Sequence, residues 1–194
     1  MNPFLSVWLH PKQTARYVIE HKSIVYPLIL LVIGYVLTGS AELFNTEAYP
    51  NLSFVWLFLI FIILVPIIGM IFMFITAGIV FFIGKLLNGT GSFWDIFKAS
   101  SLSSIPSICI APLLILGQAI NEVSAVGLIA GILTIVISIW SVVILVAAIA
   151  EAHQFSIIRS IITLIIPTIL LVLLFIGIII IIVIFFAVAF DSMI

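Results

Sequence analysis

Long stretches without a charged residue alternate with short polar segments along the 194-residue chain, and there are five such stretches. Crossing the hydrocarbon core of a bilayer takes about 20 apolar residues in a helix, so each stretch is long enough for a crossing. The pattern predicts an all-α integral membrane protein with five transmembrane helices. The expected spans are about 23–43, 52–84, 97–119, 123–150 and 160–190.

The second and fifth stretches are longer than one crossing needs, and each contains a proline. A proline inside a helix removes a backbone hydrogen bond and kinks the helix. We therefore expect kinks at Pro66 and Pro167. Each stretch is then either one long kinked helix or a segment lying flat in the membrane followed by a crossing, and both interpretations stay open.

The basic residues predict the orientation, because Lys and Arg concentrate in cytoplasmic loops. With five spans and a cytoplasmic N-terminus, all six fall inside: Lys12, Arg16, Lys22, Lys85, Lys98 and Arg159. If the second stretch crossed twice, Lys85 and Lys98 would move outside, so charge placement favours five spans. The short tail 191–194 is then expected outside.

Composition excludes other classes of protein. The chain is 65% hydrophobic and 7% charged, whereas a soluble domain is about half apolar and a quarter charged. Six basic residues and a net charge of −1 do not form a phosphate-binding face, so we expect no nucleic-acid partner. The sequence completes no catalytic, nucleotide-binding or metal-ligand motif, so no enzyme activity, cofactor or metal is expected.

The segment 1–22 is predicted to be a cytoplasmic amphipathic helix on the membrane surface. After Pro11, apolar and basic residues occupy different faces, and a tryptophan precedes them. A basic helix with aromatic anchors suits the headgroup layer. We expect Trp8, Lys12 and Arg16 to be the interfacial anchor. The segment either docks a partner or an anionic lipid, or simply fixes the first span, and the pattern favours the second role.

Four serines at helical spacing share one face at the start of the third span: Ser100, Ser103, Ser104 and Ser107. Serines in a membrane helix bond across to other helices or satisfy carbonyls that a proline has freed. The face is therefore either a polar path for a ligand or lipid headgroup, or packing around a kink. The nearby prolines favour packing.

Small residues form a stripe along the fourth span: Gly127, Gly131, Thr134 and Ser138. Small residues let helix backbones approach closely in lipid, and the two glycines make a GxxxG pair. The stripe is predicted to pack against another helix. That helix belongs either to the same chain, which we favour, or to a second copy in a homo-oligomer.

The segment between the second and third spans carries a family motif. A glycine-rich turn is followed by Ser-Phe, by a second Phe four residues later, and by a serine-rich helix with Ile-Pro. The motif residues are Gly89, Gly91, Ser92, Phe93, Phe97 and Pro106. In this order and spacing they resemble the Yip family, the Ypt/Rab-interacting membrane proteins. The resemblance extends to the opening Asn2-Pro3-Phe4 with Trp8, Pro11 and Thr14, and to Phe155, Ser156 and Arg159 before the last span.

The resemblance implies five spans, a cytoplasmic N-terminus and an outer C-terminus. Eukaryotic members are associated with Rab GTPases and with traffic between endoplasmic reticulum and Golgi. This chain lacks their Asp-Leu-Tyr-Gly-Pro and their long N-terminal region. It is therefore similar to compact prokaryotic-type members, which implies a prokaryotic plasma membrane and no Rab binding.

The leading functional hypothesis is a non-enzymatic protein that organises or binds other membrane components through its cytoplasmic face. Its partners would be membrane lipids, other membrane proteins or a second copy. The contact surface would comprise 1–22 and 85–98, so alanine at Phe93 and Phe97 should weaken partner capture without abolishing insertion. The rival hypothesis is a small transporter or lipid-translocating protein that uses the serine face of the third span.

Overall fold

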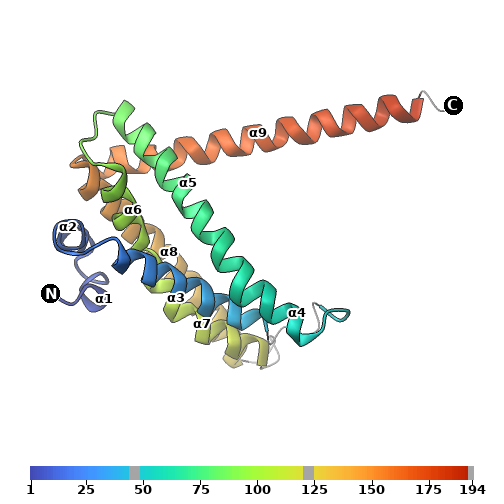
Figure 1. The fold of residues 1–194 in the computed structure, drawn as a ribbon, viewed down its shortest axis with the longest axis horizontal. Coiled ribbons are helices and arrows are strands. Elements are labelled where there is room, and N and C mark those ends of the chain that lie inside the picture. Colours follow the sequence, from blue (N-terminus) through green and yellow to red (C-terminus); the bar gives the residue numbers. More distant parts are fainter. Residues whose placement is uncertain (44–48, 120–124, 192–194) are drawn as a thin grey trace.

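The computed structural model describes residues 1–43, 49–119 and 125–191, and over these residues the chain forms helices and turns but no β-strand (Figure 1). The helices are α1 (Pro3–Ser6), α2 (Pro11–His21), α3 (Val25–Glu42), α4 (Phe54–Phe58), α5 (Val65–Leu86), α6 (Phe93–Ser101), α7 (Ser104–Ala119), α8 (Ala125–His153) and α9 (Ile157–Asp191), with a π-helical segment η2 (Leu59–Leu64) between α4 and α5. The prediction of an all-helical chain is confirmed.

Four helical runs of the described chain are long and apolar enough to cross a membrane: Val25–Glu42, Phe54–Leu86, Phe93–Gly117 and Ala125–His153. They overlap the first four predicted spans, with ends that differ by up to four residues. A shorter apolar helix, Ile157–Leu170, begins α9, where the fifth span is predicted. In Figure 1, α3, α5, α7 and α8 form the body of the molecule, while α9 starts beside α5 and α8 and then leaves them.

The second predicted span is one helical run whose irregular part lies just before its proline. Pro66 occupies the first turn of α5 and is buried. Proline donates no backbone hydrogen bond, and its ring presses on the carbonyl four residues earlier. That carbonyl belongs to Ile62 in η2. The wider π-helical turn accommodates this local mismatch without ending the run.

The third predicted span consists of two helices, α6 and α7, separated by a tight turn at Leu102 and Ser103. The turn has backbone hydrogen bonds spanning three residues, including the bond from the Ile105 amide to the Leu102 carbonyl at 3.2 Å. Pro106 has no amide hydrogen with which to bond that carbonyl in the α-helical manner. The Ser103 hydroxyl also donates to the Ser100 carbonyl at 2.7 Å, a local bond that competes with the helix.

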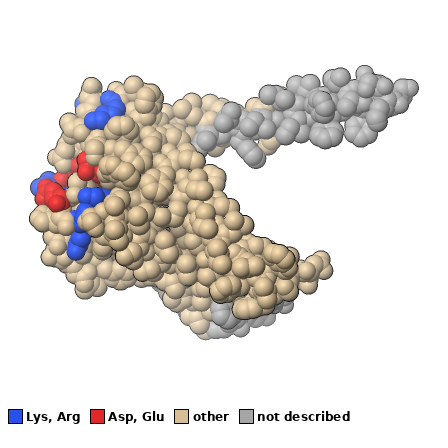
Figure 2. Space-filling view, in the orientation of Figure 1, with Lys and Arg blue, Asp and Glu red and all other residues tan. Residues whose placement is uncertain are grey.

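The best-packed core lies at one end of the molecule, where α2, α6 and α8 meet. Phe97, Leu102, Ile144 and Val18 are fully buried there. Figure 2 shows the visible Lys, Arg, Asp and Glu side chains gathered at this same end. We call it the charged end, and it comprises α1, α2, the segment 85–94 and the junction of α8 with α9.

Candidate interaction surface and polar cavity

The N-terminal segment is held against the helical bundle at the charged end. The Asn2 side chain caps α1 by accepting a hydrogen bond from the Phe4 amide at 3.1 Å. The hydroxyls of Ser6 and Thr14 lie 2.7 Å apart and join α1 to α2. The apolar face of α2, including Ala15, packs on α8 and α6. Protein therefore covers much of the face that the sequence pattern assigned to the membrane surface.

An ion pair fixes α2 to the end of α8. The Arg16 Nε lies 2.7 Å from the Glu151 Oε1, and the Glu151 side chain is only 10% exposed. By accepting this hydrogen bond, Glu151 holds the pKa of the Arg16 guanidinium above its ordinary value. In the last turn of α2, the Ile19 carbonyl accepts a hydrogen bond from the Lys98 ammonium at 3.0 Å, and a cation is favourable at this end of a helix. Arg16 of α2 and Lys98 of α6 thus each form a charged hydrogen bond that holds α2 in position.

Replacing Glu151 by Gln is expected to loosen α2. Gln keeps the size of the side chain but removes the charge that attracts Arg16, so hydrogen exchange of the α2 backbone amides should become roughly fivefold faster. Mass spectrometry of exchange in detergent or nanodiscs measures this directly. Glu20→Gln is the control, because Glu20 lies on α2 itself and is exposed. Equal exchange rates in the two variants would contradict a role for the ion pair.

The predicted turn between α5 and α6 encloses the last residue of α8. The His153 carbonyl accepts a hydrogen bond from the Thr90 amide at 3.0 Å, and the Lys85 ammonium donates to the Thr90 carbonyl at 3.1 Å. The His153 imidazole is fully buried and stacks on Phe155 with 4.9 Å between ring centres. Within the described residues neither of its ring nitrogens has a hydrogen-bond partner.

Glycines of the turn make room for this histidine. A Cβ added at Gly84 or at Gly89 would overlap the His153 ring, and one at Gly91 would overlap the Ala152 carbonyl. The motif glycines are therefore required by close packing of the turn on the end of α8. Sequence reasoning flagged Gly89 and Gly91 but missed the histidine, because nothing in the local pattern around His153 reveals what it contacts.

The remaining motif residues build the start of α6. Ser92 and Asp95 form a reciprocal cap, in which each side chain accepts a hydrogen bond from the backbone amide of the other, at 3.2 and 2.9 Å. Phe97 is fully buried and stacks on Phe74 with 4.5 Å between ring centres. Pro106 is buried as well.

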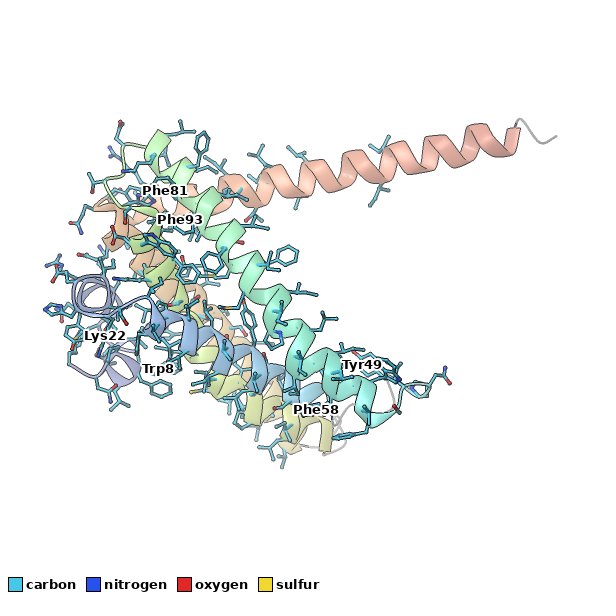
Figure 3. The ribbon with its side chains drawn as sticks, in the orientation of Figure 1. Trp8, Lys22, Tyr49, Phe58, Phe81 and Phe93 are labelled. Atoms are coloured by element: carbon cyan, nitrogen blue, oxygen red, sulfur yellow. The ribbon has the colours of Figure 1, made fainter. Side chains whose placement is uncertain are left out.

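Exposure differs sharply along the first turn of α6. Figure 3 shows Phe93 near Phe81 at the charged end, and their ring centres are 6.5 Å apart. Phe93 is half-buried, whereas Trp94 is 51% exposed. Trp94, which the sequence analysis did not place in the motif, is therefore the more exposed of the two aromatic side chains at the start of α6.

The predicted anchor residues lie on the outer side of the charged end. Trp8 is half-buried against the core cluster, while Lys12 and Arg16 are exposed. Beside them, Leu9 is 79% exposed. The charged end thus combines exposed apolar side chains with basic groups.

All four serines of the predicted polar face line one cavity of about 220 Å³ inside the bundle. Ser100 and Ser103 come from the end of α6 and the turn after it, and Ser104 and Ser107 come from α7. Three more hydroxyls complete the lining, those of Tyr35 and Thr38 on α3 and Ser141 on α8. We call this space the polar cavity. The structure thus brings together the residues proposed for a polar path.

The small-residue stripe of α8 has a different environment. Gly131 and Ser138 are exposed, and a Cβ added at Gly131 would meet no other group within 4 Å. Gly127, Gly131 and Thr134 line an open groove of about 610 Å³ between α7 and α8. The favoured close contact with another span of the same chain is therefore not made at Gly131.

A model of the Yip1 domain matches residues 5–190 of the chain. The chain belongs to the Yip1 domain family. Yip1 proteins are generally non-enzymatic membrane trafficking proteins, and this one is an integral membrane protein with several apolar helices. The resemblance stated from the sequence is confirmed. Neither the curated proteins nor the solved structures give a match.

Within this Yip1 domain the match covers both regions described above. It includes the motif turn that packs on His153 and the serines of the polar cavity, because both lie between residues 5 and 190. The matched residues of the Yip1 domain thus include both the polar cavity and most of the charged end.

Proposed function

We propose that this Yip1-domain protein organises or binds other membrane components through its charged end. The observation that carries the proposal is the combination of exposed Trp94 and Leu9 with a basic surface held rigid by the Arg16–Glu151 pair. Large exposed apolar side chains beside charges mark surfaces that contact proteins or lipid headgroups. A rigid surface also loses little conformational entropy when it binds.

The proposal includes a topology of five spans with the charged end in the cytoplasm. Support comes from the basic residues, since Lys and Arg favour the cytoplasmic side, and Figure 2 has the visible ones at one end. The fifth span would be α9, whose 35 residues exceed the length that one crossing needs. The C-terminus would then be outside, and the lack of the Asp-Leu-Tyr-Gly-Pro segment of eukaryotic members favours a prokaryotic plasma membrane.

The proposed partners are membrane lipids, other membrane proteins or a second copy of the chain. We propose no Rab-type GTPase as a partner, because the sequence lacks the Asp-Leu-Tyr-Gly-Pro segment of the eukaryotic members. The contact region contains too few basic residues to favour nucleic acid.

Photo-crosslinking tests the contact surface. A photoreactive residue is placed separately at Leu9 and at Trp94, cells are illuminated, and the adducts are identified by mass spectrometry. We expect one recurrent protein, or a crosslinked dimer of the chain, at both positions. The control position is Ile135, which is 62% exposed on α8 and far along the helix from the charged end.

The control position decides between a contact surface and general exposure to lipid. Ile135 should give mainly lipid adducts, because it is an apolar side chain on a membrane-spanning helix. If Leu9 and Trp94 also give lipid adducts alone, the charged end does not organise other proteins, and of the proposed partners only membrane lipids are left.

The polar cavity favours a second candidate function, a small transporter or lipid-translocating protein. Its hydroxyl lining lies between α3, α7 and α8 in an otherwise apolar body. Reconstituted protein would then move a neutral solute or lipid, and a bulky residue at Ser104 would block the movement. Movement indifferent to that change would count against the path.

A further inference from the structure

The polar cavity has a hydroxyl lining but no charged lining residue. Ser100, at its wall, is 94% buried by the surrounding helices. A polar surface enclosed in a membrane protein is stable only when its groups are hydrogen-bonded or when it meets a polar occupant. The lining therefore defines what the occupant must offer.

Five of the seven lining hydroxyls direct their hydrogens to main-chain carbonyls. On α3, Tyr35 donates to Gly69 at 3.0 Å and Thr38 donates to Gly34 at 2.8 Å. On the opposite wall three serine hydroxyls donate to backbone carbonyls. Ser103 donates to the Ser100 carbonyl at 2.7 Å, Ser104 to the Ser101 carbonyl at 2.6 Å, and Ser141 to the Ser103 carbonyl at 2.6 Å. The oxygens of these five hydroxyls keep lone pairs, so they can accept hydrogen bonds from an occupant but have no second hydrogen to give.

The two remaining hydroxyls are those of Ser100 and Ser107, and within the described part of the chain they have no protein partner. Each of them can donate or accept. The polar cavity thus offers an excess of acceptors over donors. An occupant that donates several hydrogen bonds satisfies it best.

Charge excludes two classes of occupant. A phosphate or carboxylate needs donors, preferably cationic ones, and the lining has no Lys or Arg. An ammonium ion would be partly desolvated there with no carboxylate to pair with it, which is unfavourable. An uncharged group with several hydroxyls meets neither obstacle.

We propose that the polar cavity binds an uncharged polyol group of glycerol type, either as a free molecule or as the neutral headgroup of a lipid. Its volume of about 220 Å³ holds several water-sized groups, at about 30 Å³ for each water, which suits a three-carbon polyol. This inference does not involve the charged end. It names the ligand class for the second candidate function, and it concerns binding rather than movement.

Glycerol is the first probe, and saturation-transfer NMR on the full-length protein in nanodiscs measures its binding. In Ser107→Leu the larger leucine side chain fills the cavity, and the change removes no hydrogen bond to the described residues. We therefore expect at least tenfold weaker glycerol binding. Ser138→Leu is the matched control, because Ser138 is exposed on α8 and lies outside the lining. Glycerol signals that are equal in these two variants overturn the proposal.

A second pair keeps the test valid if Ser107→Leu fails to fold, which a thermal melt would reveal. Ser141→Ala and Ser138→Ala each remove a hydroxyl that donates to a backbone carbonyl, at 2.6 and 2.7 Å, and the two residues are one turn apart. Only Ser141 lines the polar cavity. We expect weaker glycerol binding in Ser141→Ala alone, and an equal effect of both changes overturns the proposal.

A lipid arm separates the two sources of the polyol. Nanodiscs containing a monoacylglycerol, whose neutral headgroup is a glycerol with two free hydroxyls, are analysed by native mass spectrometry for lipid retained by wild type but lost in Ser107→Leu. Retention supports a headgroup site, and glycerol binding without retention supports a free-polyol site. Failure of both probes overturns the proposal. If a probe binds but reconstituted vesicles show no flux, the binding inference stands and the transport function fails.

Discussion

Replacing Phe97 by Ala should lower the free energy of unfolding by about 3 kcal/mol, the lower part of the range for a buried phenylalanine. Phe97 is fully buried and stacks on Phe74 of α5 at 4.5 Å. Packing contacts rather than water exclusion stabilise helices in lipid, so the loss comes from contacts that the cavity leaves unmade. Unfolding in mixed micelles, followed by circular dichroism, measures it.

Trp94→Ala is the matched control for Phe97→Ala. Trp94 is also aromatic and belongs to the same helix, but it is 51% exposed, so its loss should cost less than about 1 kcal/mol. The two variants thus separate stability from contact: Phe97→Ala should destabilise the protein, and Trp94→Ala should reduce partner crosslinking. Equal unfolding free energies would mean that Phe97 is not a core residue.

The burial of Phe97 changes the role expected for the motif phenylalanines. Alanine at Phe97 was expected to weaken partner capture while leaving the protein inserted. The helical spacing of Phe93 and Phe97 correctly places both on one face of α6, but spacing does not say whether that face meets a partner or the body of the protein. In the structure it meets α5, through Phe74 and Phe81.

Local sequence patterns predicted the features that depend on one helix at a time. The apolar stretches gave the four long helices, and the spacing of the serines from Ser100 to Ser107 gave their common face. The turn between α6 and α7 could also be predicted from the sequence, because Pro106 lacks the amide hydrogen that would bond the Leu102 carbonyl.

Features that need two distant segments were beyond local patterns. Arg16 and Glu151 are 135 residues apart in sequence, and either charge alone looks like an ordinary residue at a membrane edge. The same holds for Tyr35 and Ser141, which complete the polar cavity from helices far apart in the chain. Their roles follow from the packing of α3 and α8 around α7, which hydrophobic periodicity does not specify.

The small-residue stripe shows a related limit. Gly127 and Gly131 at GxxxG spacing predict a close approach by some helix, but the same spacing serves a neighbour in the chain or a second copy. Gly131 faces open space in the structure. The spacing alone therefore does not say which helix, if any, packs on Gly131.

Gly84 gives the second large effect, because it packs directly against the buried imidazole of His153. A Cβ at Gly84 would overlap that ring, so Gly84→Ala should lower the free energy of unfolding by about 1–3 kcal/mol, the usual cost of overpacking. Thermal melting in detergent, followed by the thiol reactivity of the lone Cys109, measures the change. The loss should appear at the charged end first, as faster hydrogen exchange in the segment 87–92.

Gly78→Ala is the control, since Gly78 lies on the same helix and an added Cβ there would come no closer than 3.9 Å to Phe93. Alanine favours a helix over glycine by up to about 1 kcal/mol, so this change should be neutral or stabilising.

A double variant tests the contact with His153. Adding His153→Ala to Gly84→Ala removes the ring that the new methyl group would overlap. The double variant should therefore lose less unfolding free energy than the two single variants lose in sum. Strict additivity, or equal melting of the Gly84 and Gly78 variants, would show that the turn does not close on His153 as described. The same contact joins α5 to α8 just before the turn that leads into α6, where Trp94 lies. Gly84→Ala should therefore weaken crosslinking at Trp94 more than at Leu9.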